Sequence, residues 1–106
     1  MIRDKRHLAF IRLLPCVKCG RNRTTQAAHI RKFTDGGTGL KPSDNYTVPL
    51  CSKCHAEQHQ KGEVSFWGGV ENIMNTIKLA NKLYDMDFFQ SKRVIMEYRH
   101  EIQNRQ

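Results

Sequence analysis

Two pairs of cysteines constrain this 106-residue chain more than any other feature of its sequence. Cys16 and Cys19 form one C-x-x-C turn, Cys51 and Cys54 form a second, and 31 residues lie between the two turns. Four thiolates from two such turns match the closed tetrahedral ligand set of a structural zinc ion. Disulfides, a redox-active pair and unrelated buried cysteines are the alternatives. The first residues do not resemble an export signal, which favours zinc over disulfides.

A metal ion would also supply stability that the core lacks. Apolar residues make up 39% of the chain and aromatic residues 8%, so we expect one domain over residues 1–106 with a thin hydrophobic core. Structural zinc can contribute roughly 10 kcal/mol or more to the folding of such a domain. No apolar run is long enough to cross a membrane.

The remaining sequence predicts an α+β fold. Asp4 is a candidate N-cap for a short helix that runs to about Leu14. Strands are expected at residues 26–30 and 46–50, and Pro49 restricts the second to an edge or a strand end. A short helix should follow the second cysteine pair and end at Gly62.

Two further helices are expected over about residues 69–104, with a break at residues 85–87. Their apolar positions recur at helical spacing and predict core packing over the cysteine-bearing half. These positions are Val70, Ile73, Met74, Ile77 and Tyr84 in the first helix, Val94, Ile95, Tyr98 and Ile102 in the second, and Phe66, Trp67, Phe88 and Phe89 beside them.

Positive charge is concentrated in the first third of the chain. Residues 1–32 contain nine Lys and Arg residues and one acid, whereas the rest of the chain carries equal numbers of each sign. This asymmetry favours a surface that binds a polyanion, above all a nucleic-acid backbone, over a merely solvated basic face. The residues predicted to contact phosphates are Lys5, Arg6, Arg21, Arg23, Arg31 and Lys32.

Three histidines are placed where they could do chemistry. His55 and His59 are four residues apart on the expected helix after the second cysteine pair, so both rings can hold one metal ion. His29 comes from the end of the first expected strand. Taken singly, each could be an ordinary strand or surface residue, but their joint occurrence within the cysteine frame favours a functional site.

Together these motifs resemble the four-cysteine branch of the HNH endonucleases, which have the ββα-metal fold. The resemblance covers about residues 7–67 and is closest to small phage and prophage members, including the phage recombination enhancement nucleases. The order of its parts is the first C-x-x-C, Ala28-His29-Ile30, Lys41-Pro42-Ser43-Asp44-Asn45, Thr47-Val48-Pro49-Leu50, and Cys51-x-x-Cys54-His55-x-x-x-His59. It implies a zinc-stapled ββα-metal core at about residues 14–62.

The resemblance also implies roles for single residues. His29 would be the general base, His55 a ligand of a catalytic ion and His59 a second ligand. Asn45 would fix the base or its loop. Many members have another ligand just before the base, where this chain has Ala28, so the ion would have two protein ligands plus waters unless Asp44 joins them.

The sequence therefore predicts a metal-dependent endonuclease that hydrolyses DNA phosphodiester bonds in the cytoplasm, with phage or host recombination proteins as partners. Two nitrogen ligands favour Mn²⁺, Ni²⁺, Co²⁺ or Zn²⁺, and Mg²⁺ stays open because waters complete the shell. The main alternative is a zinc-stapled DNA-binding or recombination accessory protein without catalysis. An RNA-binding knuckle protein is a weaker alternative, since no aromatic platform for bases stands out.

Overall fold

The computed structural model describes residues 1–37 and 39–105, without the side chains of residues 102–105. The predicted core position Ile102 lies outside these described side chains. The chain forms α1 (Lys5–Ile11), β1 (Thr25–His29), β2 (Thr47–Cys51), α2 (Ser52–Lys61), α3 (Glu63–Trp67), α4 (Val70–Tyr84) and α5 (Phe88–Arg105). The predicted α+β class is confirmed, with a single two-stranded sheet in the described part of the chain.

The sheet connects the two cysteine turns. β1 and β2 pair antiparallel, with His29 opposite Thr47 and Thr25 opposite Cys51, each strand displaced by one residue from its predicted bounds. Pro49 sits in the middle of β2, where its carbonyl accepts a hydrogen bond from the Val17 backbone 3.0 Å away. Because a residue's carbonyl and N–H point to the same side of a strand, the N–H that proline lacks would face away from β1. The ladder to β1 therefore loses no hydrogen bond.

The N-terminal helix begins as predicted and ends early. The Asp4 carboxylate caps α1 by accepting from the His7 backbone N–H at 3.0 Å. The helix ends at Ile11 and not near Leu14, because the Leu13 and Leu14 amides bond carbonyls three residues back and tighten the chain into turns. Leu14 is nevertheless buried, so the expected apolar face is retained.

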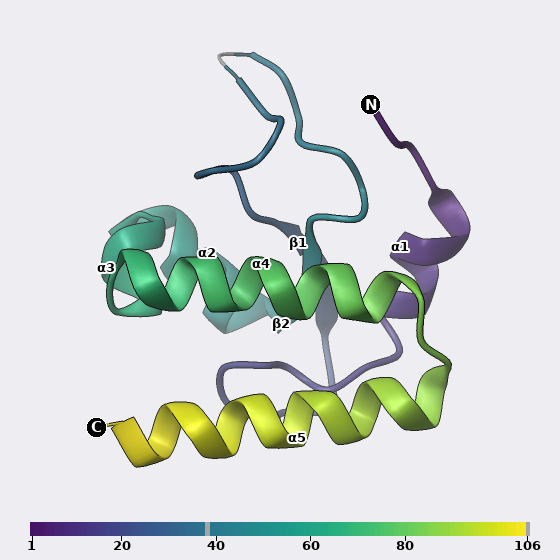
Figure 1. The fold of residues 1–106 in the computed structure, drawn as a ribbon, viewed down its shortest axis with the longest axis vertical. Helices are drawn as coiled ribbons and strands as arrows, with labels where there is room; N and C mark the ends of the chain where they lie inside the picture. The colour runs from purple at the N-terminus through teal and green to yellow at the C-terminus, as the bar shows by residue number, and fades with distance from the viewer. Residues whose placement is uncertain (38, 106) are drawn as a thin grey trace.

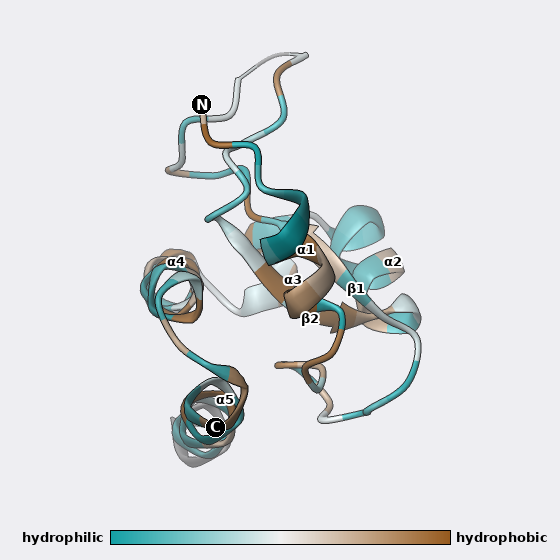
Figure 2. Cartoon of the chain, turned by 90° about the vertical axis from the view of Figure 1, so that its right-hand side faces the viewer, coloured by the Kyte–Doolittle hydropathy of each residue, from teal (hydrophilic) through white to brown (hydrophobic). Residues whose placement is uncertain are grey.

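The two C-terminal helices run side by side in opposite directions along one flank of the molecule (Figure 1). Figure 2 views them nearly end-on, with the sheet and the remaining helices beside them. Ile73 and Ile77 of α4 are buried, as is Ile95 of α5, and the Thr76 and Tyr98 hydroxyls hydrogen-bond across the pair. α4 also packs on β2, which places the helical layer against the cysteine-bearing half.

Three predicted core residues face solvent. Val70 is 51% exposed, Met74 43% and Phe89 80%, so these core predictions are wrong. Phe88 is partly buried while Phe89 is exposed, because consecutive helical residues project about 100° apart and only one of the two can face the core. Val70 and Met74 lie at the edge of the α4 stripe, which buries Thr76, Ala80 and Leu83 instead.

The short helix α3 is an element that the sequence does not predict. It lies between Gly62 and Gly68, both of which have positive φ, and it buries Phe66 and Trp67. The Trp67 indole donates to the Gln58 side chain of α2 at 2.9 Å, so burial of the indole leaves no polar atom unpaired. α3 thereby packs against α2 at Gln58, next to His59 of the predicted histidine pair.

Candidate metal centre and histidine cleft

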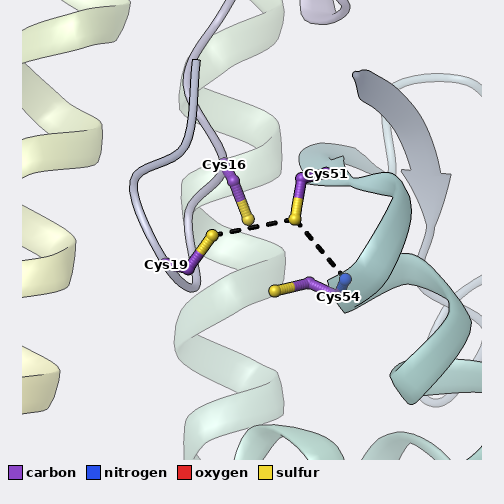
Figure 3. Close-up of side chains that lie close together, drawn as sticks. All are labelled: Cys16, Cys19, Cys51 and Cys54. Carbon is purple, nitrogen blue, oxygen red and sulfur yellow. Dashed lines mark hydrogen bonds between the residues drawn. The ribbon is translucent and has the colours of Figure 1, made fainter. Parts of the chain in front are cut away.

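The four cysteines converge on one point at the end of the sheet where β1 begins and β2 ends. Their sulfur atoms all lie within 4.8 Å of one another, and the Sγ atoms of Cys19 and Cys51 are 3.7 Å apart (Figure 3). Thiolates bound to one tetrahedral zinc ion at 2.3 Å would be about 3.8 Å apart. All four cysteines are free thiols in the structure. The cluster therefore fits a structural zinc ion.

Local backbone geometry explains how the first cysteine turn brings the sulfurs of Cys16 and Cys19 together. The Gly20 amide donates to the Cys16 carbonyl at 2.9 Å, and Gly20 has a φ of +81°, which a side chain would strain. A Cβ at this position would also lie 2.5 Å from the Arg99 guanidinium of α5. Glycine thus permits the tight turn and leaves room for the end of the Arg99 side chain.

The second pair uses the start of α2. Cys51 is the N-cap, and its sulfur accepts from the Cys54 backbone N–H at 3.5 Å. Burial raises the pKa of Cys51, but this N–H and the neighbouring thiols outweigh it and bring the pKa to about 7. Burial raises the pKa of Cys54, as do the adjacent sulfurs. Cys51 is therefore the thiol of this pair that ionises more readily.

His55 and His59 meet on one face of α2, as their spacing predicts. Their Nε2 atoms are 3.2 Å apart, and two nitrogen ligands bound to one ion at about 2.1 Å would be separated by a similar distance. His55 Nδ1 lies 2.6 Å from the Gln26 side-chain oxygen, which accepts a hydrogen bond from Nδ1–H and leaves Nε2 with its lone pair. Burial lowers the pKa of His55, helped by the neighbouring His59 and His29, which favours the neutral ligand form.

His29, at the end of β1, is paired with Asp44. Its Nε2 lies 2.9 Å from the Asp44 carboxylate, and both side chains are largely buried. Burial opposes ionisation of Asp44, yet hydrogen bonds from the Asp4 amide and His29 hold its pKa below the ordinary value. An ionised carboxylate can only accept, so Nε2 carries the proton and Nδ1 keeps a free lone pair. Burial lowers the pKa of His29, which makes this neutral form dominant at neutral pH.

Asp44 is itself fixed by the N-terminal segment. Its carboxylate accepts from the Asp4 backbone amide at 2.7 Å and lies 3.6 Å from the Arg3 guanidinium. The Asp44 amide in turn donates to the Ile2 carbonyl at 2.9 Å. The loop between the strands is therefore tied to residues near the start of the chain, and Asp44 is oriented toward His29 rather than toward the His55–His59 pair.

Asn45, predicted to fix the base or its loop, ties the loop to α4 and does not hold the base. Its amide donates to the Asn81 side chain on α4 at 3.2 Å, whereas His29 is held by Asp44. Asp44, the residue before Asn45, thus fixes the His29 ring. No sequence signal separates the two neighbours, and the motif suggests Asp44 only as an extra metal ligand.

A surface cleft of about 290 Å³ brings together His29 and one histidine of the α2 pair, His59. It is lined by His29, Arg31, Lys32, Gln58, His59, Gly62 and Glu63. Glu63, which no sequence motif singles out, accepts from the Arg31 and Lys32 backbone amides at 2.7 and 2.8 Å. Among the described residues, the only group of three or more metal-binding side chains that converges is the four cysteines, so an ion in the cleft would have two protein ligands.

Comparison with known proteins places this architecture in a family. A family model described as "Protein of unknown function (DUF968)" matches residues 1–83. The chain belongs to the DUF968 family. The match includes the cysteine cluster, the three predicted site histidines and nearly all of α4, and it ends before α5. No curated protein and no solved structure matches the chain.

The basic residues of this DUF968 chain lie on its surface. Lys5, Arg6, Arg21, Arg23, Arg31 and Lys32 are all exposed. Lys5 and Arg6 are on α1, Arg21 and Arg23 follow the first cysteine turn, and Arg31 and Lys32 line the cleft. Within the described part of the chain, no helix combines the length and apolarity needed to span a bilayer.

Proposed function

We propose that this DUF968 protein is a metal-dependent endonuclease of the HNH type that hydrolyses DNA phosphodiester bonds. One observation carries the proposal: His29, held by an ionised carboxylate, lines the same cleft as His59, whose ring meets that of His55. A neutral base beside a pair of nitrogen ligands is the arrangement that metal-assisted hydrolysis requires.

The order of elements supports the HNH assignment. β1 ends at His29, β2 runs into the second cysteine turn, and α2 carries His55 and His59. The elements thus follow one another in the order ββα. The sheet register places the end of β1 opposite Thr47, so His29 and the loop that carries Asp44 are adjacent. The resemblance seen in the motifs thus has a counterpart in the spatial order of the chain.

In the proposed reaction, His29 Nδ1 takes a proton from a water molecule whose oxygen attacks phosphorus. The bond from phosphorus to the 3′-oxygen breaks, and that oxygen gains a proton from solvent. The products are a 5′-phosphate and a 3′-hydroxyl. Asp44 keeps the ring in the productive tautomer and stabilises the imidazolium that forms.

His55 and His59 would hold the divalent ion, with Gln26 fixing the His55 ring. When bound, such an ion supplies positive charge that stabilises the transferring phosphoryl group and the leaving 3′-oxygen. A separate zinc ion at the four cysteines would have no open coordination position and would serve folding alone. The exposed basic residues would bind flanking phosphates of the DNA.

A second candidate is a zinc-stapled DNA-binding protein that does not cleave. The observation favouring it is that only two protein ligands converge in the cleft, with the buried Ala28 preceding His29. Both candidates predict DNA binding that weakens with salt.

The test is to incubate purified, zinc-loaded protein with supercoiled plasmid and with single-stranded circles, adding Mg²⁺, Mn²⁺, Co²⁺, Ni²⁺ or Zn²⁺ separately. The endonuclease proposal predicts nicked or linear products only when a divalent ion is added. DNA binding without cleavage under every ion would favour the accessory protein.

A further inference from the structure

The contact between Glu63 and the loop after β1 resembles the binding of an anion by backbone amides. Both carboxylate oxygens are used, one accepting from Arg31 N–H at 2.7 Å and the other from Lys32 N–H at 2.8 Å. The pairing joins residues more than 30 positions apart and lies at the cleft that contains His29 and His59. Two amides converging on one anion form a site suited to either a carboxylate or a phosphate.

The loop is shaped to present these amides. Phe33 has a positive φ of 63°, and the Thr34 hydroxyl donates to the Ile30 and Arg31 carbonyls at 2.8 Å each. This turn keeps successive N–H groups on one side. The side chains of Arg31 and Lys32 are exposed, so two positive charges are available beside the amides.

Glu63 can leave this position without unfolding the helix it begins. It is the first residue of α3 and is only partly buried, and Gly62, with a φ of +81°, separates it from α2. A rotation of its side chain would release both amides. While it stays in place, its negative charge opposes any phosphate entering the cleft.

We propose that the Arg31 and Lys32 amides form a phosphate subsite and that Glu63 occupies it as an internal phosphate mimic. This inference rests on the proposed function and deepens it: a phosphodiester one position from the scissile bond displaces Glu63, binds the freed amides and pairs with the two basic side chains. Glu63 then acts as a gate that only a polyanion can open.

The experiment compares wild type with Glu63→Ala and Glu63→Gln, and uses Glu71→Gln as the matched control. Glu71 is exposed on α4 and does not line the cleft, so its substitution changes net charge equally but leaves the amides alone. Affinity for a 20-base-pair duplex is measured by fluorescence anisotropy without added divalent ion. In parallel, inorganic phosphate is titrated while the Arg31 and Lys32 amide signals are followed by NMR.

Glu63→Ala should bind the duplex about tenfold more tightly than wild type, as expected when a charge-assisted pair of hydrogen bonds becomes available to the ligand. Glu63→Gln should fall between the two, and Glu71→Gln should change affinity by less than about twofold. Phosphate should shift both amide signals saturably in Glu63→Ala and leave those of wild type nearly unchanged.

The inference is overturned if folded Glu63→Ala binds DNA no better than wild type and phosphate does not shift its Arg31 and Lys32 amide signals. Glu63 would then serve only to join α3 to the loop after β1. If Glu63→Ala does not fold, unchanged or weaker binding by Glu63→Gln overturns it equally. Failure of the proposed function looks different: no ion supports plasmid nicking, while the amides still respond to phosphate.

Discussion

The cysteine cluster and the histidine cleft share the same sheet and helix but differ in almost every physical property. Cys16, Cys51 and Cys54 are buried, and four sulfurs can complete the shell of one ion. In the cleft, His59 is exposed and two nitrogen ligands leave most of a metal's shell to water. Cys54 and His55 are consecutive on α2, so one helix carries a closed site on one side and an open site on the other.

A small chain can combine stability with reactivity by keeping the two kinds of site apart. A closed thiolate site contributes folding free energy and leaves no position for a substrate, whereas an open site binds an ion more weakly and keeps positions free for chemistry. Substitutions in the cysteine cluster should consequently unfold the domain, and substitutions in the histidine cleft should leave a folded protein with altered ion binding or cleavage.

The most severe consequence should follow loss of one cysteine sulfur. Cys54→Ser removes a buried ligand, and the loss of structural zinc should cost several kcal/mol, enough to unfold the domain. Wild type should contain one tightly bound zinc per chain by elemental analysis, and the variant should lose both the ion and its helical circular dichroism signal. A well-folded wild type free of metal would contradict the structural role.

Loss of a histidine of the α2 pair should spare the fold. His55→Ala removes a ligand that is itself oriented by Gln26, so affinity for the second ion should fall by about 100-fold or more, with zinc content and melting temperature near those of wild type. His59→Ala should weaken binding less, because this exposed ligand can be replaced by water. Calorimetric titration with Mn²⁺ measures the affinity of both variants. Equal decreases in melting temperature in the two variants would indicate that the histidines serve packing instead.

Asp44→Asn should change how cleavage depends on pH. The reaction needs neutral His29, whose pKa lies below the ordinary histidine value because the ring is buried, so the rate should rise with pH and level off at a lower pH than an ordinary histidine would give. Asp44 partly opposes the lowering of the His29 pKa, because its carboxylate favours the imidazolium. Loss of the carboxylate should therefore shift the pH at which the cleavage rate rises to a still lower value. The plateau rate should fall by about tenfold or more as the ring loses its fixed tautomer. A profile identical to wild type would remove Asp44 from the mechanism.

Substitutions on the basic surface should have the smallest effect per residue, which is a decrease in DNA affinity. Replacing Lys5, Arg6, Arg21 and Arg23 with Gln should lower affinity for all DNA sequences alike. The slope of log K against log salt should fall by about 0.9 for each phosphate that the protein no longer neutralises. Anisotropy titrations at several salt concentrations measure this slope. An unchanged slope would mean that these side chains do not contact phosphates and contribute only to solubility.

The parts of this fold that could be predicted from the sequence depend on local patterns. The Asp4 cap, the C-x-x-C turns and the i, i+4 spacing of His55 and His59 each act within one turn of chain. The burial predicted for Phe89 on α5 is wrong because periodicity shows that a helix has an apolar face but does not fix the rotation of that face against its neighbours.

The contacts that shape the cleft could not be predicted because they join distant segments. Asp44 reaches His29 only because residues near the chain start hold its loop, through hydrogen bonds such as Ile2 N–H to Ser43 Oγ at 2.9 Å. Glu63 meets the Arg31 amide through α3, a helix that no sequence pattern predicts. Neither pairing leaves a periodic or spacing signal in the sequence.

His29 is the residue on which the proposed chemistry of the cleft depends, and it lies at the end of β1 away from the cysteine cluster. Its role is tested by a plasmid-nicking time course for His29→Ala beside wild type, in whichever divalent ion supports cleavage. Zinc content, Mn²⁺ affinity and melting temperature are measured on the same samples. We predict that the nicking rate falls by about 100-fold or more while the other three properties are retained. Nicking by His29→Ala at the wild-type rate would contradict the role of His29 as the base.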